Sequence, residues 1–144
     1  MSTQMRASKI SVVRTNYKFE APVLGTSAPT GLPKREFNLN NLLDLNSFLA
    51  PVPENCFLVR VSGQSMIDAN INTGDILVVD KSETPRNGKI VIASLNGEMA
   101  VKYFQQNKDG TFLVSANKSF LPIRISELFE FQIQGVVKHV IKDI

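Results

Sequence analysis

The chain has 144 residues, of which 43% are hydrophobic and 20% charged, and its formal net charge is +3. This length fits one domain with an extension, and the composition excludes a disordered chain and a coiled coil. No run of 18 apolar residues and no signal-peptide core occurs, so the sequence predicts neither a membrane span nor export. The single cysteine, Cys56, excludes an intrachain disulfide, fits a reducing cytoplasm, and is predicted to be a small buried residue.

The positive charge is concentrated in the first 40 residues, which carry six basic and two acidic groups. Residues 41–144 carry ten basic and eleven acidic groups. A compact nucleic-acid-binding core would show a basic surplus, and this one has none. The basic segment either contacts phosphate or is a solvated cationic tail.

The N-terminal part of the chain is rich in small polar residues, with five prolines and glycines between Pro22 and Pro33. This composition predicts an extended, poorly packed, flexible arm over residues 1–36, followed by one domain over residues 37–144. Asn38–Phe48 contains four leucines, which is enough for one short helix or turn.

From Cys56 onward, short apolar runs alternate with turn residues. Asn96-Gly97 is the strongest short signal for a hairpin. We expect strands over Phe57–Val61, Asp75–Asp80, Lys89–Leu95, Glu98–Phe104, Thr111–Ser115 and Phe131–Ile141. Strands at this spacing predict an all-β domain, either a sandwich or a barrel-like sheet.

Ser65 lies between the first two predicted strands of the domain. Gly63 permits a sharp exit from the first strand, and a short helix is predicted from Ser65 to Asn70. A serine at a helix N-terminus would place its Oγ beside backbone N–H groups, its own and that of Met66, which could stabilise an oxyanion. Serine is nearly inert without an adjacent base, so the alternative is an ordinary helix N-cap.

Lys102 can supply such a base only if its environment lowers its pKa from about 10.4 towards the working pH. The predicted strand Glu98–Phe104 has apolar residues on both faces, so the lysine is expected against or within the core. The alternative is an edge-strand lysine whose amine reaches solvent. Taken together, Ser65 and Lys102 indicate a Ser–Lys hydrolase site.

Other chemistries find less support in the sequence. His139 is the only histidine, so a Ser–His–Asp triad would depend on a residue in an apolar final strand. Cys56 and His139 lack further ligands for zinc, and Asp68, Asp75 and Asp80 do not follow the spacing of a calcium loop. Asn72 to Asp75 is predicted as a turn, and no phosphate-binding glycine loop occurs. The sequence predicts no metal and no nucleotide cofactor.

Five ordered blocks of the chain carry a resemblance to a known family. They are Val61–Asp68, Gly74–Asp80, Gly88–Ala93, Val101-Lys102 and Gly135–Lys142. Together these blocks resemble the LexA-type Ser–Lys self-cleaving proteins, in particular their short UmuD branch. The match runs from about residue 37 to the C-terminus, about three quarters of the chain. Each motif alone is weak evidence for the family, but several motifs in the same order make the resemblance strong.

The resemblance implies a LexA C-terminal-like β-domain that cuts one bond in its own N-terminal arm. It implies that Ser65 is the nucleophile and Lys102 the general base. The matching bond is Leu24-Gly25, where the family usually has Ala-Gly or Cys-Gly. Leucine is bulkier than the usual residue, so either the pocket is wider or the cut is slow. Gly25 suits the role because it lets backbone approach the nucleophile closely.

The resemblance also implies partners. A RecA filament on single-stranded DNA stimulates the cut in such proteins. The trimmed protein, as a homodimer, joins a UmuC-like Y-family polymerase subunit for error-prone translesion synthesis in the SOS response of the bacterial cytoplasm. No direct sequence-specific DNA binding is expected, because the arm before Phe37 is too short for a helix-turn-helix. The alternatives are a regulator acting through partners, a signal-peptidase-type enzyme, which would need a membrane anchor, and an inert β-domain.

Overall fold

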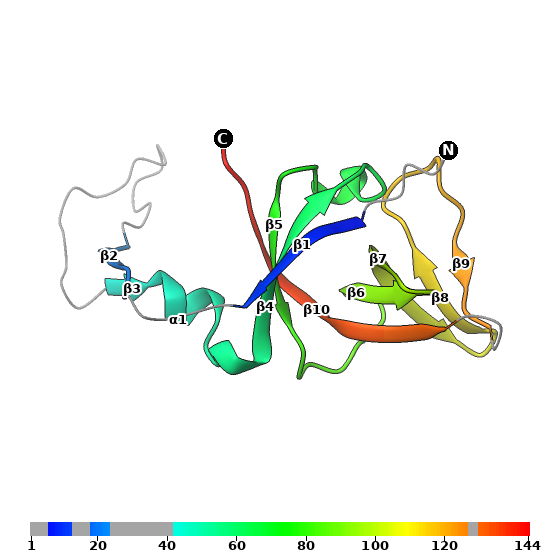
Figure 1. Ribbon diagram of the computed structural model, residues 1–144, viewed down its shortest axis with the longest axis horizontal. Coiled ribbons are helices and arrows are strands. Elements are labelled where there is room, and N and C mark those ends of the chain that lie inside the picture. Colours follow the sequence, from blue (N-terminus) through cyan, green and yellow to red (C-terminus); the bar gives the residue numbers. More distant parts are fainter. Residues whose placement is uncertain (1–5, 13–17, 24–41, 127–129) are drawn as a thin grey trace, which may run out of the picture. The chain divides into compact units, whose positions relative to one another are not determined.

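The structure is a computed structural model that describes residues 6–12, 18–23, 42–126 and 130–144 (Figure 1). The chain forms two compact units, one of Met1–Val13 with Glu54–Ile144 and one of Arg14–Pro53. Within the described residues, no helix has the length and apolar character needed to cross a membrane.

The smaller unit contains one strand pair and one turn of helix. Strand β2 (Glu20–Pro22) pairs antiparallel with β3 (Leu42–Asp44), and helix α1 (Leu45–Leu49) follows directly. The carboxylate of Asp44 caps this helix, because it accepts hydrogen bonds from the Asn46 backbone N–H and the Ser47 hydroxyl. A short helix or turn was predicted within Asn38–Phe48, and the structure has a helix that begins only after this cap.

The larger unit is built around one antiparallel sheet with two short 3-10 helices. Its elements are β1 (Arg6–Val12), η2 (Pro53–Asn55), β4 (Cys56–Ser62), η3 (Ile67–Ala69), β5 (Ile76–Asp80), β6 (Ile90–Leu95), β7 (Glu98–Asn107), β8 (Gly110–Val114), β9 (Ile123–Arg124) and β10 (Phe131–Ile141). The strand order is β1-β4-β5-β10-β6-β7-β8-β9. The predicted all-β class is confirmed, and each of the six predicted strands is present. Strands β1 and β9 were not predicted.

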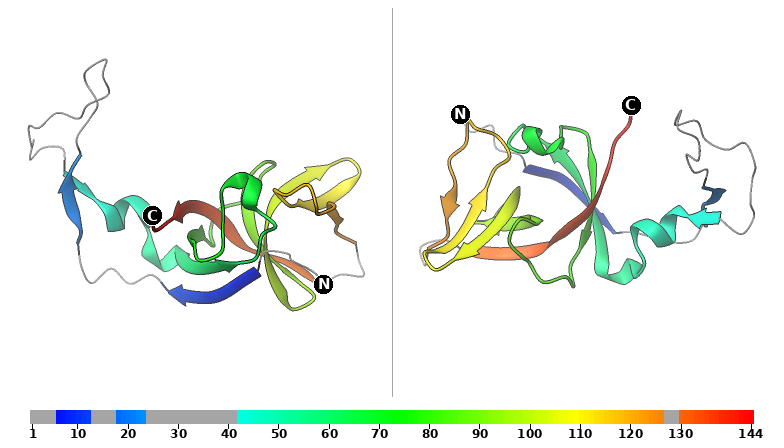
Figure 2. Two further views of the ribbon diagram at one scale, coloured as in Figure 1. Left: turned by 90° about the horizontal axis from the view of Figure 1, so that it is seen from above. Right: turned by 180° about the vertical axis from the view of Figure 1, so that it is seen from behind.

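The sheet curls until its first and sixth strands meet. Strand β1 pairs along β4 and also places Arg6 opposite Ala100 of β7. Strand β10 turns the corner, because one half of it pairs with β5 and the other half with β6. Each pairing contains one register shift, and Val136 has a partner in both. Figure 2 shows β1 lying along β4 and β10 crossing from β5 to β6. The result is a barrel-like ring rather than a flat sandwich.

The interior of this ring is filled by alternate residues of its strands, by two side chains from the loop after β4 and by one from the segment after β8. The buried cluster consists of Phe57, Val59, Val61, Met66, Ile71, Leu77, Val79, Ile92, Val101 and Ala116. Because Met66 and Ile71 are fully buried in this cluster, the loop that follows β4 is fixed by packing as well as by hydrogen bonds.

Candidate active site

The loop that carries Ser65 leaves β4 through a sharp turn. Gly63 has a φ of 100°, which a glycine adopts without steric cost, and its N–H and C=O both bond to the hydroxyl of Thr73 at 3.0 Å. The helix predicted from Ser65 to Asn70 is a single 3-10 turn over Ile67–Ala69. Its N-cap is Met66 and no side chain caps it, so the alternative of Ser65 as an ordinary N-cap is wrong. Ser65 is fully buried.

Lys102 lies in β7, between β6 and β8, and is 0% exposed. The alternative of an edge-strand lysine reaching solvent is therefore wrong. Its Nζ donates a hydrogen bond to Ser115 Oγ at 2.6 Å and lies 5.3 Å from the centre of the Phe120 ring. Burial removes the amine from water, which penalises its charged form and lowers the pKa of Lys102 from 10.5 to about 8.

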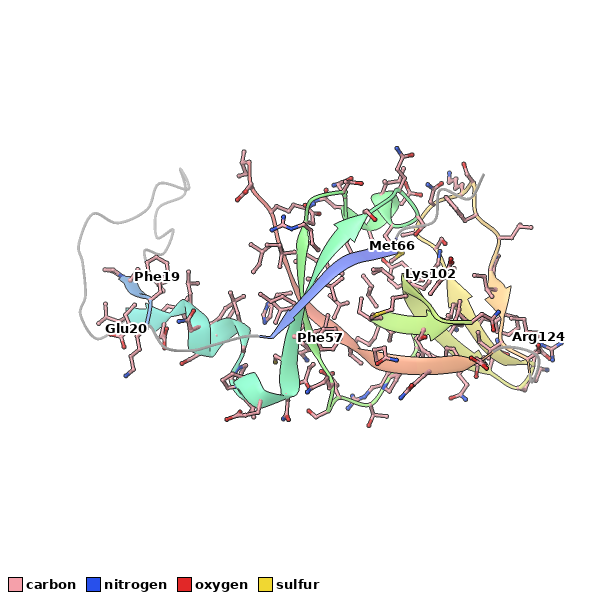
Figure 3. All side chains as sticks on the ribbon, in the orientation of Figure 1. Phe19, Glu20, Phe57, Met66, Lys102 and Arg124 are labelled. Carbon is pink, nitrogen blue, oxygen red and sulfur yellow. The ribbon has the colours of Figure 1, made fainter. Side chains whose placement is uncertain are left out.

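One segment, residues 115–120, bonds both to the serine loop and to the buried lysine. The Ala116 carbonyl accepts from Asp68 N–H at 2.8 Å, and its N–H donates to the sulfur of Met66 at 3.2 Å. The Asn117 side-chain amide donates to the Gln64 carbonyl at 2.9 Å. Since the residue just before Ala116 accepts the lysine's hydrogen bond, this segment brings the two predicted site elements together. Figure 3 labels Met66, which bonds to Ala116, and Lys102, which bonds to Ser115.

The polar side chains buried in the described part of the chain are Ser65, Asp75 and Lys102. Asp75 has a structural explanation, because its carboxylate accepts from Asn72 N–H at 2.8 Å and pairs with Lys142. A buried lysine is costly in an apolar core unless it is paired or has a chemical task. The partners of Lys102 are a hydroxyl and an aromatic ring, so the chemical task is the better explanation.

Two of the aspartates weighed for a metal site, Asp75 and Asp80, have carboxylates that hold turns in the structure. The Asp75 N–H donates to the Asn72 carbonyl at 3.1 Å, which confirms the predicted turn at Asn72 to Asp75. The carboxylate of Asp80 accepts from both the N–H and the hydroxyl of Ser82, at 2.7 and 2.6 Å. Cys56 is buried as predicted, and desolvation raises the pKa of its thiol, which disfavours the reactive thiolate.

Two residues beside the lysine were missed by the sequence analysis. Ser115 was assigned to a strand end and Phe120 was not singled out, yet both contact the Lys102 amine. The sequence carried only a general signal for these contacts. A buried amine needs a hydrogen-bond partner, but no local sequence pattern indicates which residue supplies it. The predicted cleavage bond, Leu24-Gly25, lies outside the described residues.

The fold and the site together define a curled antiparallel domain in which a buried serine and a buried lysine lie on elements that one short segment joins. The chain belongs to the family described as Peptidase S24-like, whose model matches residues 22–138. The resemblance to the LexA-type serine peptidases that the sequence indicated is thereby confirmed.

The chain is similar to curated proteins that include LexA repressors and Protein ImpA. The chain is 36% identical over 131 residues to a LexA repressor of Moorella thermoacetica, a match that covers 90% of this chain and 63% of that protein. It is 40% identical over 100 residues to Protein ImpA of Salmonella typhimurium, covering 69% of this chain and 67% of that protein. A LexA repressor of Alcanivorax borkumensis is 36% identical over 99 residues, 65% of this chain and 48% of its own length. The chain thus spans less than two thirds of the LexA repressors it matches.

Proposed function

We propose that this protein is a self-cleaving Ser–Lys peptidase of the bacterial SOS response, and that its substrate is its own N-terminal arm. The observation that supports the proposal best is that one short segment bonds both to the desolvated Lys102 and to the loop of the fully buried Ser65. A lysine whose pKa is near 8 is neutral in an appreciable fraction at physiological pH, as a general base must be.

The chemistry follows from these groups. The neutral Lys102 amine takes the hydroxyl proton of Ser65, whose Oγ attacks the carbonyl carbon of Leu24. The N–H groups of Ser65 and Met66 stabilise the oxyanion. The lysine ammonium then gives its proton to the departing amide nitrogen of Gly25, and the acyl ester on the serine is hydrolysed by a water that the same amine activates. An arm on the same chain has a high effective concentration, so one slow turnover suffices.

The rate of arm cleavage is expected to rise about tenfold from pH 7 to about pH 9 and then level off. With a pKa of about 8, roughly a tenth of the lysine is neutral at pH 7 and nearly all of it above pH 9. Intact-mass analysis of purified protein over this range gives the rate, and a fragment beginning at Gly25 identifies the bond. A rate independent of pH would contradict a lysine base.

The proposed partners follow from the family resemblance. A RecA filament on single-stranded DNA is expected to accelerate the cut, and the trimmed chain, as a homodimer, is expected to bind a UmuC-like Y-family polymerase subunit as an accessory to translesion synthesis. The first is tested by adding RecA, nucleotide and single-stranded DNA to the cleavage assay. The second is tested by comparing copurification of the polymerase subunit with the full and the trimmed chain.

Arm removal is also expected to change the sheet edge. A cut at Leu24-Gly25 severs β1 from the domain, and β4 then becomes an edge strand. Backbone N–H groups of β4 that face β1 should therefore exchange with deuterium much faster in the trimmed protein, while those of β6 keep their protection. Unchanged protection of β4 would show that the severed arm stays bound.

A second candidate function is a transcriptional regulator, which the similarity to LexA repressors favours. The two functions are separated by a direct DNA-binding measurement with the purified chain. Sequence-specific binding at physiological salt would support the regulator, and salt-sensitive binding without sequence preference would not.

A further inference from the structure

The Lys102 amine has a hydrogen-bond partner besides the serine that the proposed mechanism requires. Its Nζ donates to Ser115 Oγ at 2.6 Å. Ser115 directly follows β8, is only partly buried, and begins the segment whose next two residues bond to the loop of Ser65. Ser115 is therefore bonded directly to Lys102 and is tied to the loop of Ser65 through the two residues that follow it.

This contact restricts where the amine can direct its lone pair. A neutral lysine amine has two N–H bonds and one lone pair, and only the lone pair can accept a proton. A hydrogen bond from one N–H to Ser115 stops free rotation of the amine, and the Phe120 ring 5.3 Å away occupies another of its sides. The lone pair can therefore point in few directions. A base held in the right orientation transfers a proton faster than one that rotates freely.

We propose that Ser115 is a positioning residue, which holds the Lys102 amine so that its lone pair faces the hydroxyl of Ser65. The inference rests on the proposed function, because it assigns a role towards that same reaction. Ser115 does not touch the scissile bond in this scheme. It acts through the lysine, and its loss slows proton transfer without removing the base or the nucleophile.

Two other roles for Ser115 give different results. In the first, Ser115 does no more than accept a hydrogen bond that the buried Lys102 amine would otherwise lack, and its loss then affects stability and not the chemistry. It could itself be the hydroxyl that Lys102 deprotonates, in which case it is the nucleophile. The variants below separate the three roles.

The experiment measures the pH profile of arm cleavage for the full chain and for Ser115→Ala, Ser115→Thr, Ser65→Ala and Ser119→Ala. Ser119 is a matched control, an exposed serine in the same segment. In Ser115→Ala, we expect the rate on the high-pH plateau to fall by about 10- to 100-fold. We also expect the pH midpoint to move down, because a hydroxyl acceptor stabilises the ammonium more than the amine. Threonine keeps the hydroxyl and should restore most of the rate, and Ser119→Ala should match the wild type.

Each result either supports or overturns the proposed role of Ser115. A Ser115→Ala plateau within twofold of the wild type overturns the inference, whatever its thermal stability. If Ser115→Ala unfolds, Ser115→Thr carries the test, and a Thr variant that is folded but as slow as Ser65→Ala also overturns it. If Ser65→Ala still cuts the arm while Ser115→Ala does not, the nucleophile is Ser115 and the proposed function fails in its assignment of Ser65. Loss of the cut in Ser65→Ala alone leaves the proposed function standing without the positioning role.

Discussion

Replacing either proposed catalytic residue, by Ser65→Ala or by Lys102→Ala, is expected to slow arm cleavage by at least about 10³-fold. The serine variant lacks the atom that attacks the carbonyl. The lysine variant leaves a hydroxyl without a base, and an unassisted serine is nearly inert at neutral pH. Intact-mass analysis over several days at pH 9 would detect even a small residual rate.

The double variant adds a second, sharper test. The effects of substituting residues that act as one unit do not add. The double variant Ser65→Ala with Lys102→Ala should therefore cleave no more slowly than the slower of the two single variants. Matched controls are Ser119→Ala and Lys108→Ala, which remove an exposed serine and an exposed lysine and should leave the rate unchanged. Persistence of the same cut in purified Ser65→Ala would show that another group or a contaminating protease is responsible.

The strands of the domain were predictable because their signals are local. Short apolar runs predicted β4, β5 and β10, and the Asn96-Gly97 turn, with φ values of 51° and 84°, confirmed the hairpin between β6 and β7. Strand β1 was assigned to an arm expected to be poorly packed. Its pairing with β4 joins segments about 50 residues apart, and no local pattern encodes such a partner.

The sequence singled out Ser65 and Lys102 as candidate site residues, but it did not predict the geometry around them. Apolar neighbours on both faces of β7 left open whether Lys102 was buried, and only the sheet order, which places β7 between two strands, decided it. Ser65 was expected at a helix N-terminus, but the 3-10 turn begins after Met66 because the methionine side chain is packed in the core. The contact between Lys102 and Ser115 depends on how the segment after β8 folds back, and no local sequence pattern predicts that path.

The burial of Lys102 should also be measurable as a cost in stability. Replacing it by methionine keeps a long flexible side chain and removes the charge, and Lys102→Met is expected to stabilise the fold at pH 7 by about 3 kcal/mol. The reason is that the folded state lowers the pKa of this amine from 10.5 to about 8, so at pH 7 the protein either carries a desolvated charge or gives up a proton.

The sign of the pH dependence follows from the same shift. Between about pH 8 and pH 10.5 the unfolded lysine keeps its proton while the folded one has lost it, so the stability of the wild-type fold rises with pH across this window. The gain in the free energy of unfolding from Lys102→Met should therefore be largest at pH 7 and below, and should shrink towards pH 10.5. Urea unfolding at pH 7 and pH 10, with Ser65→Ala in both proteins to prevent cleavage, measures the difference.

An exposed lysine gives the control, because Lys108→Met should change stability little and by the same amount at both pH values. If Lys102→Met were no more stable than its parent at pH 7, the amine would be solvated in the folded state and its use as a neutral base would lose its physical basis. If the expected gain is found together with loss of cleavage, a residue that destabilises the fold is kept for its chemistry, which is the signature of a catalytic rather than a structural lysine.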